Sequence, residues 1–325
     1  MDSSKNPERE NLMAIGIDPT VDYAFKRMLG SPEHTAITIH FINSVLSCDP
    51  PIVEVDLLNP FLEQETEEDK LAILDIRARD DQGRWLNIEM QTSLPGSLPD
   101  RLTYYVSSLY AEQLQQGEQY GDLRPAVTIC VLDQVLFPWV PDPHLRFMLH
   151  EPNHRLLLTD HLQVHLMELP KYNCEKEELA HATPLQMWFY FLRNATNLDR
   201  EEIERLLPDI PFLEAAGVLE MIARSPRERE LYKARLKLAR DEEARLRGAR
   251  EAGWSEGAAE GRKEGRKEGR KEGVERGRLF GRIELLQQLL ERPITSVEDL
   301  QAMSTSDLQQ RLEALQAELR SREST

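Results

Sequence analysis

The sequence predicts a mixed α/β domain followed by an all-helical C-terminal extension. Apolar residues recur with helical spacing over 20–30 and 33–47, and three β-rich runs follow within 52–91. A further helix and strand come next, at about 98–116 and 126–133. This order of helix, three strands, helix and strand indicates a mixed sheet flanked by helices.

Each element has a local signal. The first helix carries Val21, Ala24, Phe25 and Met28 on one face and ends at Gly30. Runs rich in β-branched and aliphatic residues predict strands at about 52–58, 71–79, 85–91 and 126–133, and also near 145–150, 154–159 and 162–169. Helices are predicted near 98–116, 175–193, 200–207, 212–224 and 227–251.

The composition excludes several classes of protein. Hydrophobic residues make up 40% of the 325 residues, which is enough for a core and excludes a wholly disordered chain. No apolar run approaches the ~20 residues of a transmembrane helix, and the first residues lack the apolar segment of a secretory signal. The three cysteines are far apart and match neither a zinc site nor a disulfide framework. We therefore expect a cytoplasmic protein with no membrane partner.

The charge is large and uneven. The formal net charge is −17; residues 231–325 carry 20 basic and 18 acidic side chains, which leaves 20 basic and 39 acidic ones in 1–230. Bulk electrostatic attraction therefore opposes nucleic-acid binding by the N-terminal part. Any DNA contact there needs local basic groups and metal ions.

A glycine repeat covers 253–281, with glycine at every fourth position and three copies of GRKE. Each glycine costs a helix about 1 kcal/mol relative to alanine, whereas an i,i+3 ion pair returns only tenths of that. The repeat therefore predicts a solvated, marginally helical linker. Nucleic-acid contact through the Arg/Lys pairs and close helix packing through the glycines are the alternatives.

Helical spacing of apolar residues returns at 283–290 and at 308–319, where leucines follow a 4-3-4 pattern after a serine cap at 304 or 306. Such short helices bury little alone, so they should pack on each other or on a second copy of the chain. We expect a homo-oligomer formed through them. The predicted domains are 1–230, a linker over 231–282 and an appendage over 283–325.

The segment 71–91 predicts a β-hairpin, because the polar sequence DDQGR separates two β-rich runs. If the turn centres on Gln82, opposed residues have numbers that sum to 164, so Asp75 faces Glu89. Strand alternation puts Gln91 on the same face as Glu89. An odd sum would turn Asp75 to the opposite face.

Two opposed carboxylates repel each other and are costly in a protein interior. A divalent cation such as Mg²⁺ removes this cost, because its ligands are one or two carboxylates, a carbonyl, waters and phosphate oxygens. Such an ion polarises a phosphate, activates water and stabilises a departing oxyanion. The alternative is a solvent-facing strand on which Asp75 and Glu89 are simply hydrated.

The strand IEMQ at 88–91, with Asp75 before it, resembles the PD-(D/E)XK nuclease superfamily and most of all its recombination-promoting nuclease (Rpn), transposase-like family. Further matches extend over nearly the whole chain: Asp22 before Phe25-Lys26, Arg101 before Tyr104-Tyr105, Gly117 with Tyr120, Arg124-Pro125, the stretch 226–235 and the glycine repeat. The resemblance implies a restriction-endonuclease-like core, Mg²⁺ or Mn²⁺ as the cofactor and DNA as the partner.

The resemblance also implies roles at the matching positions. Asp75 and Glu89 would bind the metal through their side chains, and Met90 through its backbone carbonyl. Gln91 would orient the attacking water or contact the scissile phosphate, but it lacks the positive charge of the lysine that is usual in the superfamily. Asp22 would add a further acidic group; its alternative is a residue that interacts favourably with the helix dipole.

The missing positive charge has to come from the metal or from Arg77 across the hairpin. Lys26, one turn into the first helix, would contact phosphate; a solvated surface lysine is its alternative. Arg101, Tyr104 and Tyr105 begin the helix after the hairpin and would hold a DNA strand through charge and stacking. Tyrosines at such positions also serve as core or rim residues.

His161 and His165 are spaced four residues apart, but their segment is predicted to be a strand. Four strand residues span roughly 13 Å, which is too far for two side chains to share one metal ion.

We therefore expect a metal-dependent DNA endonuclease that promotes recombination or DNA mobility. The alternative is a catalytically weak nuclease fold that acts as a DNA-binding or protein-interaction module and assembles through its helical tail. The set Asp75, Glu89 and Gln91 favours the enzyme. The acidic charge of 1–230 and the missing lysine favour the module.

Overall fold

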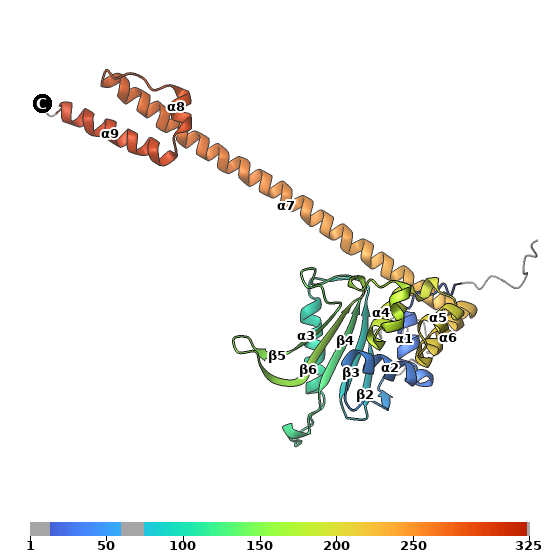
Figure 1. Ribbon diagram of the computed structural model, residues 1–325. Coiled ribbons are helices and arrows are strands. Elements are labelled where there is room, and N and C mark those ends of the chain that lie inside the picture. Colours follow the sequence, from blue (N-terminus) through green and yellow to red (C-terminus); the bar gives the residue numbers. More distant parts are fainter. Residues whose placement is uncertain (1–13, 60–74, 324–325) are drawn as a thin grey trace, which may run out of the picture. The chain divides into compact units, whose positions relative to one another are not determined.

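The computed structural model describes residues 14–59 and 75–323, and in these residues a six-stranded mixed sheet has the order β1-β2-β3-β4-β6-β5 (Figure 1). The strands are β1 (Val55–Leu57), β2 (Ile76–Asp80), β3 (Trp85–Gln91), β4 (Ala126–Leu132), β5 (His144–Glu151) and β6 (Leu156–Glu168). β3 and β6 both pair with β4 in parallel, and the other neighbours are antiparallel. The predicted α/β class is confirmed.

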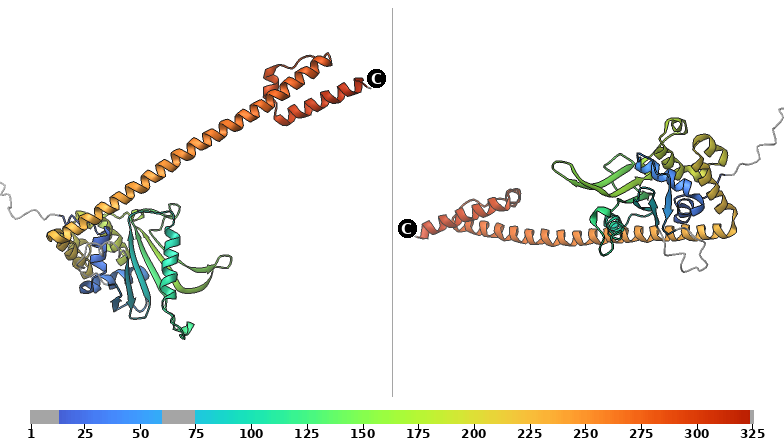
Figure 2. Two further views of the ribbon diagram at one scale, coloured as in Figure 1. Left: turned by 180° about the vertical axis from the view of Figure 1, so that it is seen from behind. Right: turned by 90° about the horizontal axis from the view of Figure 1, so that it is seen from below.

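Helices cover both faces of the sheet. One face carries α1 (Asp22–Leu29), α2 (Thr35–Leu46), α4 (Pro184–Asn194), α5 (Arg200–Leu206) and α6 (Ile210–Arg224), and the other carries α3 (Leu98–Ala111), as Figure 1 and the view from behind in Figure 2 show. The even-numbered residues of β3 are buried in the main core cluster. Trp85 packs instead against Val106 and Leu109 of α3. Strand alternation thus turns the odd-numbered side chains of β3 toward α3.

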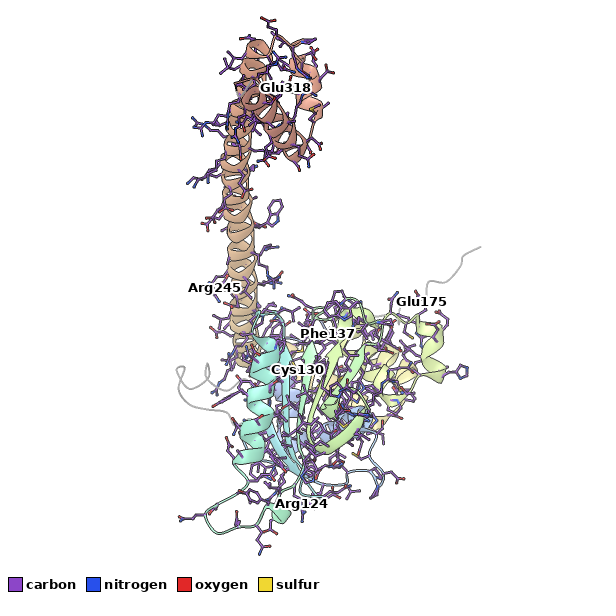
Figure 3. All side chains as sticks on the ribbon, turned by 90° about the vertical axis from the view of Figure 1, so that its left-hand side faces the viewer. Arg124, Cys130, Phe137, Glu175, Arg245 and Glu318 are labelled. Atoms are coloured by element: carbon purple, nitrogen blue, oxygen red, sulfur yellow. The ribbon has the colours of Figure 1, made fainter. Side chains whose placement is uncertain are left out.

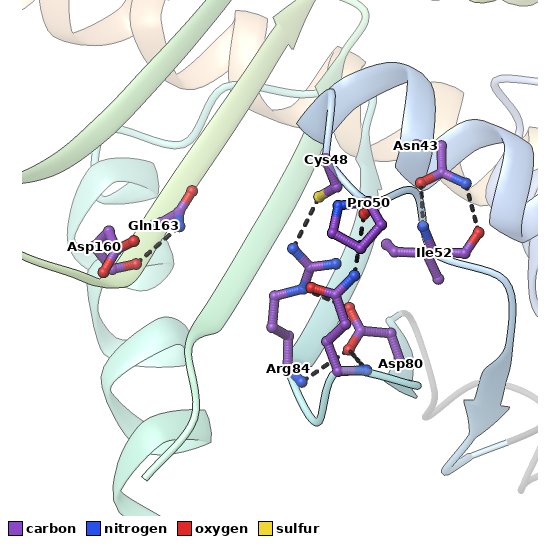
Figure 4. Close-up of polar contacts among 9 residues, drawn as sticks. Asn43, Cys48, Pro50, Ile52, Asp80, Arg84, Asp160 and Gln163 are labelled. Atoms are coloured by element: carbon purple, nitrogen blue, oxygen red, sulfur yellow. Dashed lines mark hydrogen bonds and ion pairs between the residues drawn. The ribbon is translucent and has the colours of Figure 1, made fainter. Parts of the chain in front are cut away.

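The β2–β3 hairpin has the predicted register: Arg77 pairs with Asn87, and the residue numbers of every pair from Ile76–Ile88 to Arg79–Trp85 sum to 164. The turn is held by Asp80: its Oδ1 accepts hydrogen bonds from the backbone N–H groups of Gln82 and Arg84, at 3.0 and 2.9 Å. The Arg84 guanidinium donates to Asp80 Oδ2 at 2.6 Å and to Cys48 Sγ at 2.8 Å, as Figure 4 shows. Gly83 has φ +80°, a conformation that favours glycine. These contacts specify the register from both sides of the turn.

Several predicted boundaries are wrong. β1 is shorter than 52–58, and the first part of the strand predicted over 71–79 lies outside the described residues. The strands predicted at 154–159 and 162–169 form one strand, β6, because β5 pairs along its length despite register shifts after Phe147. The far end of this β5–β6 hairpin projects from the sheet (Figure 2).

Two predicted helices also end or begin elsewhere. The helix predicted over 98–116 stops at Ala111, and Gln113 then exchanges hydrogen bonds with the backbone of Arg124, at 2.9 and 3.0 Å. The helix predicted over 175–193 is divided into a short 3₁₀ helix and α4. α4 begins where it does because Thr183 forms a capping box with Gln186 and is followed by Pro184.

The chain divides into two compact units, one ending at Leu246 and one beginning at Arg247. The helix predicted over 227–251 is longer than expected: α7 runs over Pro226–Leu289 and includes the glycine repeat. In the described part of the chain, no neighbouring group would meet a Cβ atom added at the repeat glycines. The repeat is therefore a solvated helix, and packing through its glycines is not seen among residues 14–59 and 75–323.

The second unit has a hydrophobic cluster of its own. The end of α7 packs with α8 (Val297–Ala302) and α9 (Thr305–Glu323), and the cluster buries Ile283, Leu300 and Leu308 at 3% exposure or less. Ser304 caps α9, because its hydroxyl accepts a hydrogen bond from the Asp307 N–H at 3.1 Å. The leucine pattern is thus explained by helices packing on each other, and the homo-oligomer stays a prediction. None of the helices in the described ranges has the length and apolar character of a membrane span.

A chain that ends at residue 252 is expected to fold. The main core cluster lies entirely before the boundary between the units, and the second cluster lies entirely after it. Circular dichroism should show cooperative unfolding within about 5 °C of the main transition of the full-length chain. Light scattering of both chains tests the homo-oligomer, which predicts a smaller assembly for the short one. A shortened chain without cooperative unfolding would contradict this independence.

Candidate active site

Asp75 and Glu89 oppose each other at the start of β2. The register of the hairpin, continued by one residue beyond Ile76, pairs them. The N–H of Trp85 donates to Pro125 O, and Gln91 O accepts from Asp133 N–H, so the odd-numbered backbone groups of β3 face β4 and not β2. Asp75 and Glu89 therefore form a non-hydrogen-bonded pair, in which the Cα atoms are only about 4.5 Å apart and the side chains are closest.

The Glu89 side chain is 0% exposed, and its two oxygens have different surroundings. Oε2 accepts a hydrogen bond from Gln91 Nε2 at 3.1 Å and lies 3.8 Å from Arg101 Nη2. Oε1 is buried and has no hydrogen-bond partner among the described residues. Cys130, the register partner of Glu89, lies beside α3 (Figure 3), so Glu89 is covered from that side.

The pKa of each of the two carboxyl groups is raised. The pKa of Glu89 is raised to about 7 by burial and by the nearby charge of Asp75, against the opposing effects of Arg101 and Gln91. Burial also raises the pKa of Asp75, whereas the charges of Lys26 and Arg101 lower it. Carboxyl groups that lie together and have raised pKa values are candidates for a functional site.

Lys26 enters the site from α1 and is only 5% exposed, so its interpretation as a solvated surface lysine is wrong. Its Nζ donates a hydrogen bond to the backbone oxygen of Asp75 at 3.3 Å. Burial lowers its pKa to about 8, against the opposing charges of Asp22 and Asp75. The tertiary position of α1, which sequence spacing does not show, brings this cation to the carboxylates.

Asp22 also belongs to this group. Burial raises its pKa to about 6, the charge of Asp75 acts in the same direction, and Arg235 and Lys26 oppose both. Arg235 of α7 lies 3.9 Å from Asp22 Oδ2. Arg235 was not predicted as a site residue, because nothing in its local sequence pattern shows that the first part of α7 packs near α1.

The structure places the other predicted residues around this centre. Arg77 lies 3.3 Å from Glu112 at the end of α3, and its charge lowers the pKa of Asp75 less than those of Lys26 and Arg101 do. Arg101, expected to hold DNA, is the cation next to Glu89. Its guanidinium lies 5.7 Å from the centre of the Tyr105 ring, and Tyr104 beside it is 68% exposed.

The two histidines have separate partners, as their strand spacing predicts. His161 hydrogen bonds with the Tyr110 hydroxyl at 3.0 Å, and His165 with the His144 ring at 3.0 Å. Within residues 14–59 and 75–323, no group of three or more His, Cys, Asp and Glu side chains could hold a metal ion.

The residues at Asp75 and Glu89 nevertheless fit a hard divalent cation. The donor set is two carboxylates and the Met90 carbonyl, all oxygen, and Mg²⁺ takes few protein ligands and keeps several waters. The partnerless Oε1 of Glu89 is a buried acceptor whose burial a cation would offset. The Met90 carbonyl belongs to the set of β3 backbone groups that face β2, on the side where Asp75 lies.

The raised pKa of Glu89 predicts a specific pH dependence of stability in metal-free protein. Folded Glu89 releases its proton at about pH 7, compared with an ordinary value of 4.5, so the folded state binds more protons between these values. The free energy of unfolding should therefore fall as pH rises through this window. Glu89→Gln removes this effect. Above pH 7 the free energy of unfolding of Glu89→Gln should therefore exceed that of wild type by about 3 kcal/mol more than at pH 4, since one pKa unit corresponds to about 1.4 kcal/mol.

Urea unfolding at pH 4 to 8 measures this difference between the two proteins. Asp22, with a pKa of about 6, makes the free energy of unfolding fall with rising pH in both wild type and Glu89→Gln, so its effect cancels in the difference between them. A difference that does not change with pH would contradict the assignment to Glu89.

Comparison with known proteins agrees with this geometry. A model of the family described as PD-(D/E)XK nuclease family transposase matches residues 19–249. Searches of curated proteins and of solved structures each found no match. The matched segment contains every residue of the candidate site and extends over more than half of the 325 residues. The chain therefore belongs to the PD-(D/E)XK nuclease family transposases, and its sheet with flanking helices is a restriction-endonuclease-like core.

Proposed function

We propose that this protein is a metal-dependent DNA endonuclease that hydrolyses phosphodiester bonds and thereby promotes recombination or DNA mobility. The observation that carries the proposal is the opposed pair of partly buried Asp75 and fully buried Glu89, in which the Asp75 charge raises the pKa of Glu89 and Glu89 Oε1 is unpaired among the described residues. A carboxylate pair of this kind is costly for the fold alone and becomes favourable when it binds a divalent cation.

The side chains divide the chemistry among them. Asp75, Glu89 and the Met90 carbonyl bind Mg²⁺ or Mn²⁺, which when bound polarises the phosphate and lowers the pKa of water. Gln91 donates its Nε2–H to Glu89, which leaves its amide oxygen to accept a hydrogen bond from the attacking water. Asp22, at the edge of the site, is available to bind a second water.

Positive charge reaches the phosphate from two helices. Arg101 of α3 and Lys26 of α1 lie beside Glu89 and Asp75, and they take the place of the lysine that Gln91 replaces. Tyr104 and Tyr105 continue the surface next to Arg101 and would stack on bases. Arg77 pairs with Glu112 at the end of α3 and would contact the DNA backbone outside the reaction centre.

A second candidate is a catalytically weak nuclease fold that serves as a DNA-binding or protein-interaction module. The position of Arg101 favours it, because the guanidinium already neutralises part of the Glu89 charge without a metal. DNA as the partner, a homo-oligomer through the C-terminal helices and a cytoplasmic location belong to both proposals. The free thiols of the three cysteines support a reducing location.

Nicking of supercoiled plasmid separates the two candidates. Wild type should nick the plasmid in buffer with Mg²⁺ or Mn²⁺ and not in buffer with EDTA. Asp75→Ala should be inactive in all three buffers. Asp56→Ala is the matched control, because Asp56 is an exposed carboxylate on β1 that pairs with Arg79. Binding of both variants to the same DNA without nicking by wild type would support the module and contradict the endonuclease.

A further inference from the structure

Three polar atoms lie together beneath α3 and have no hydrogen-bond partner among the residues that the structure describes. They are Asn87 Nδ2, Glu89 Oε1 and Thr128 Oγ1, and all three are buried. Asn87 is two residues before Glu89 on the same face of β3. Thr128 of β4 is the register partner of Asn87. Neighbouring strands are about 4.8 Å apart, so the three side chains form one polar patch.

The sides of this patch toward α3 and along β4 are apolar, whereas Arg77 of β2 pairs with Asn87 and Arg101 lies beside Glu89. Residues Leu102 and Val106 of α3 are buried over the same face, and Ala126 and Cys130 flank Thr128 along β4. Asn87 and Thr128 are 4% and 0% exposed. An unpaired buried polar group costs about 1–3 kcal/mol, so leucine and valine at these positions would suit the fold at least as well.

The atoms are chemically complementary. Asn87 Nδ2 can only donate, Glu89 Oε1 accepts when ionised, and the Thr128 hydroxyl can do either. No direct hydrogen bond joins them within the described residues, although they are neighbours. A water molecule that accepts from Asn87 and donates to Glu89 would satisfy both, with Thr128 as its third partner, and buried waters typically make about three such bonds.

We infer that Asn87 and Thr128 are positioning residues that hold a buried water against Glu89 Oε1 and so orient this carboxylate toward the metal. Gln91 and Arg101 both act on Oε2, so no described side chain restrains the Oε1 side of the carboxylate. The bridging water restrains it through one of the two acceptor positions of Oε1 and leaves the other for the cation. Groups that orient a ligand in this way strongly affect metal affinity. The inference rests on the proposed metal site.

Mn²⁺ binding to metal-free, full-length protein, measured by calorimetry without DNA, tests the inference. Thr128→Val keeps the shape but removes the hydroxyl, and it should weaken Mn²⁺ binding about tenfold. Thr128→Ser restores the hydroxyl and should bind within about twofold of wild type. Asn87→Leu should weaken binding similarly to Thr128→Val. Thermal unfolding should show that Thr128→Val remains cooperatively folded, so that its weaker Mn²⁺ binding does not reflect unfolding.

The outcomes distinguish this inference from the proposed function. Undiminished Mn²⁺ binding by both Thr128→Val and Asn87→Leu would overturn the positioning role and leave the endonuclease intact. Failure of wild type to bind Mn²⁺ would overturn the metal site, and the positioning role with it. A high-resolution crystal structure of the metal-free protein should show water bonded to Asn87 Nδ2 and Glu89 Oε1. Direct contact between these two side chains, with no bridging water, would also overturn the inference.

Discussion

Replacing Asp75 by asparagine or Glu89 by glutamine is expected to abolish DNA cleavage while leaving the fold intact. Each change removes a ligand charge and almost no volume from a pair that the hairpin holds face to face. Metal-assisted hydrolysis derives several kcal/mol of transition-state stabilisation from such a site, so the rate should fall about a thousandfold or more. Single-turnover cleavage of a labelled oligonucleotide measures this loss.

The control for both variants is Asp56→Asn, which removes a carboxylate from the neighbouring strand β1 at a 63% exposed side chain. It should cleave like wild type. Circular dichroism of all three proteins should be unchanged. Cleavage by Asp75→Asn or Glu89→Gln within tenfold of wild type would remove the pair from the mechanism.

Replacing Arg101 by methionine is expected to lower cleavage at pH 7 about a hundredfold, the size of effect seen when one preorganised electrostatic group is removed. The guanidinium lowers the pKa of Glu89, so its loss raises that pKa further above about 7. A smaller fraction of Glu89 is then ionised at neutral pH. The acid limb of the pH–rate profile should move to higher pH, and part of the lost activity should return at pH 9.

Two further variants make this prediction specific. Arg101→Lys keeps the charge but not the planar guanidinium. It should cleave about tenfold more slowly than wild type but faster than Arg101→Met. Arg79→Met removes an arginine of β2 that pairs with exposed Asp56 and should leave the pH–rate profile unchanged. A uniform loss at every pH in Arg101→Met would show that Arg101 acts on DNA alone and not through Glu89.

The hairpin was the most predictable part of the fold. Alternation in 85–91 and the polar turn specify both the strand ends and the parity of pairing, which are local properties. β6 was less predictable, because the polar segment around Asp160 resembles a loop between two strands. The strand is continuous because β5 pairs with β6 both before and after Asp160. The length of α7 was missed because the cost of its glycines was set against ion pairs alone, whereas the alanine, lysine, arginine and glutamate residues between them favour a helix.

The candidate site was predictable only along the strands. The hairpin register and strand alternation predict that Asp75, Glu89 and Gln91 share one face of the sheet, and the register of the structure agrees. The contact of Arg101 with Glu89 and the burial of Lys26 depend on where α3 and α1 pack against the sheet, which no spacing in the chain encodes. Strand alternation places Asn87 on the same face as Glu89. Its importance follows only from the structure, in which its amide nitrogen has no hydrogen-bond partner among the described residues.

The alternation along β3 has a genetic consequence. Inserting one codon between Ile88 and Glu89 turns Glu89 and Gln91 to the opposite face from Asn87, or forces a bulge at that point. An insertion between Asp80 and Trp85 can lengthen the turn and leave the pairing of the two strands as it is. In a library of single-codon insertions over 76–91, selected for cleavage, insertions in the turn should therefore survive more often than insertions within β3. The map of tolerated insertions would thus outline the strand that carries the catalytic centre.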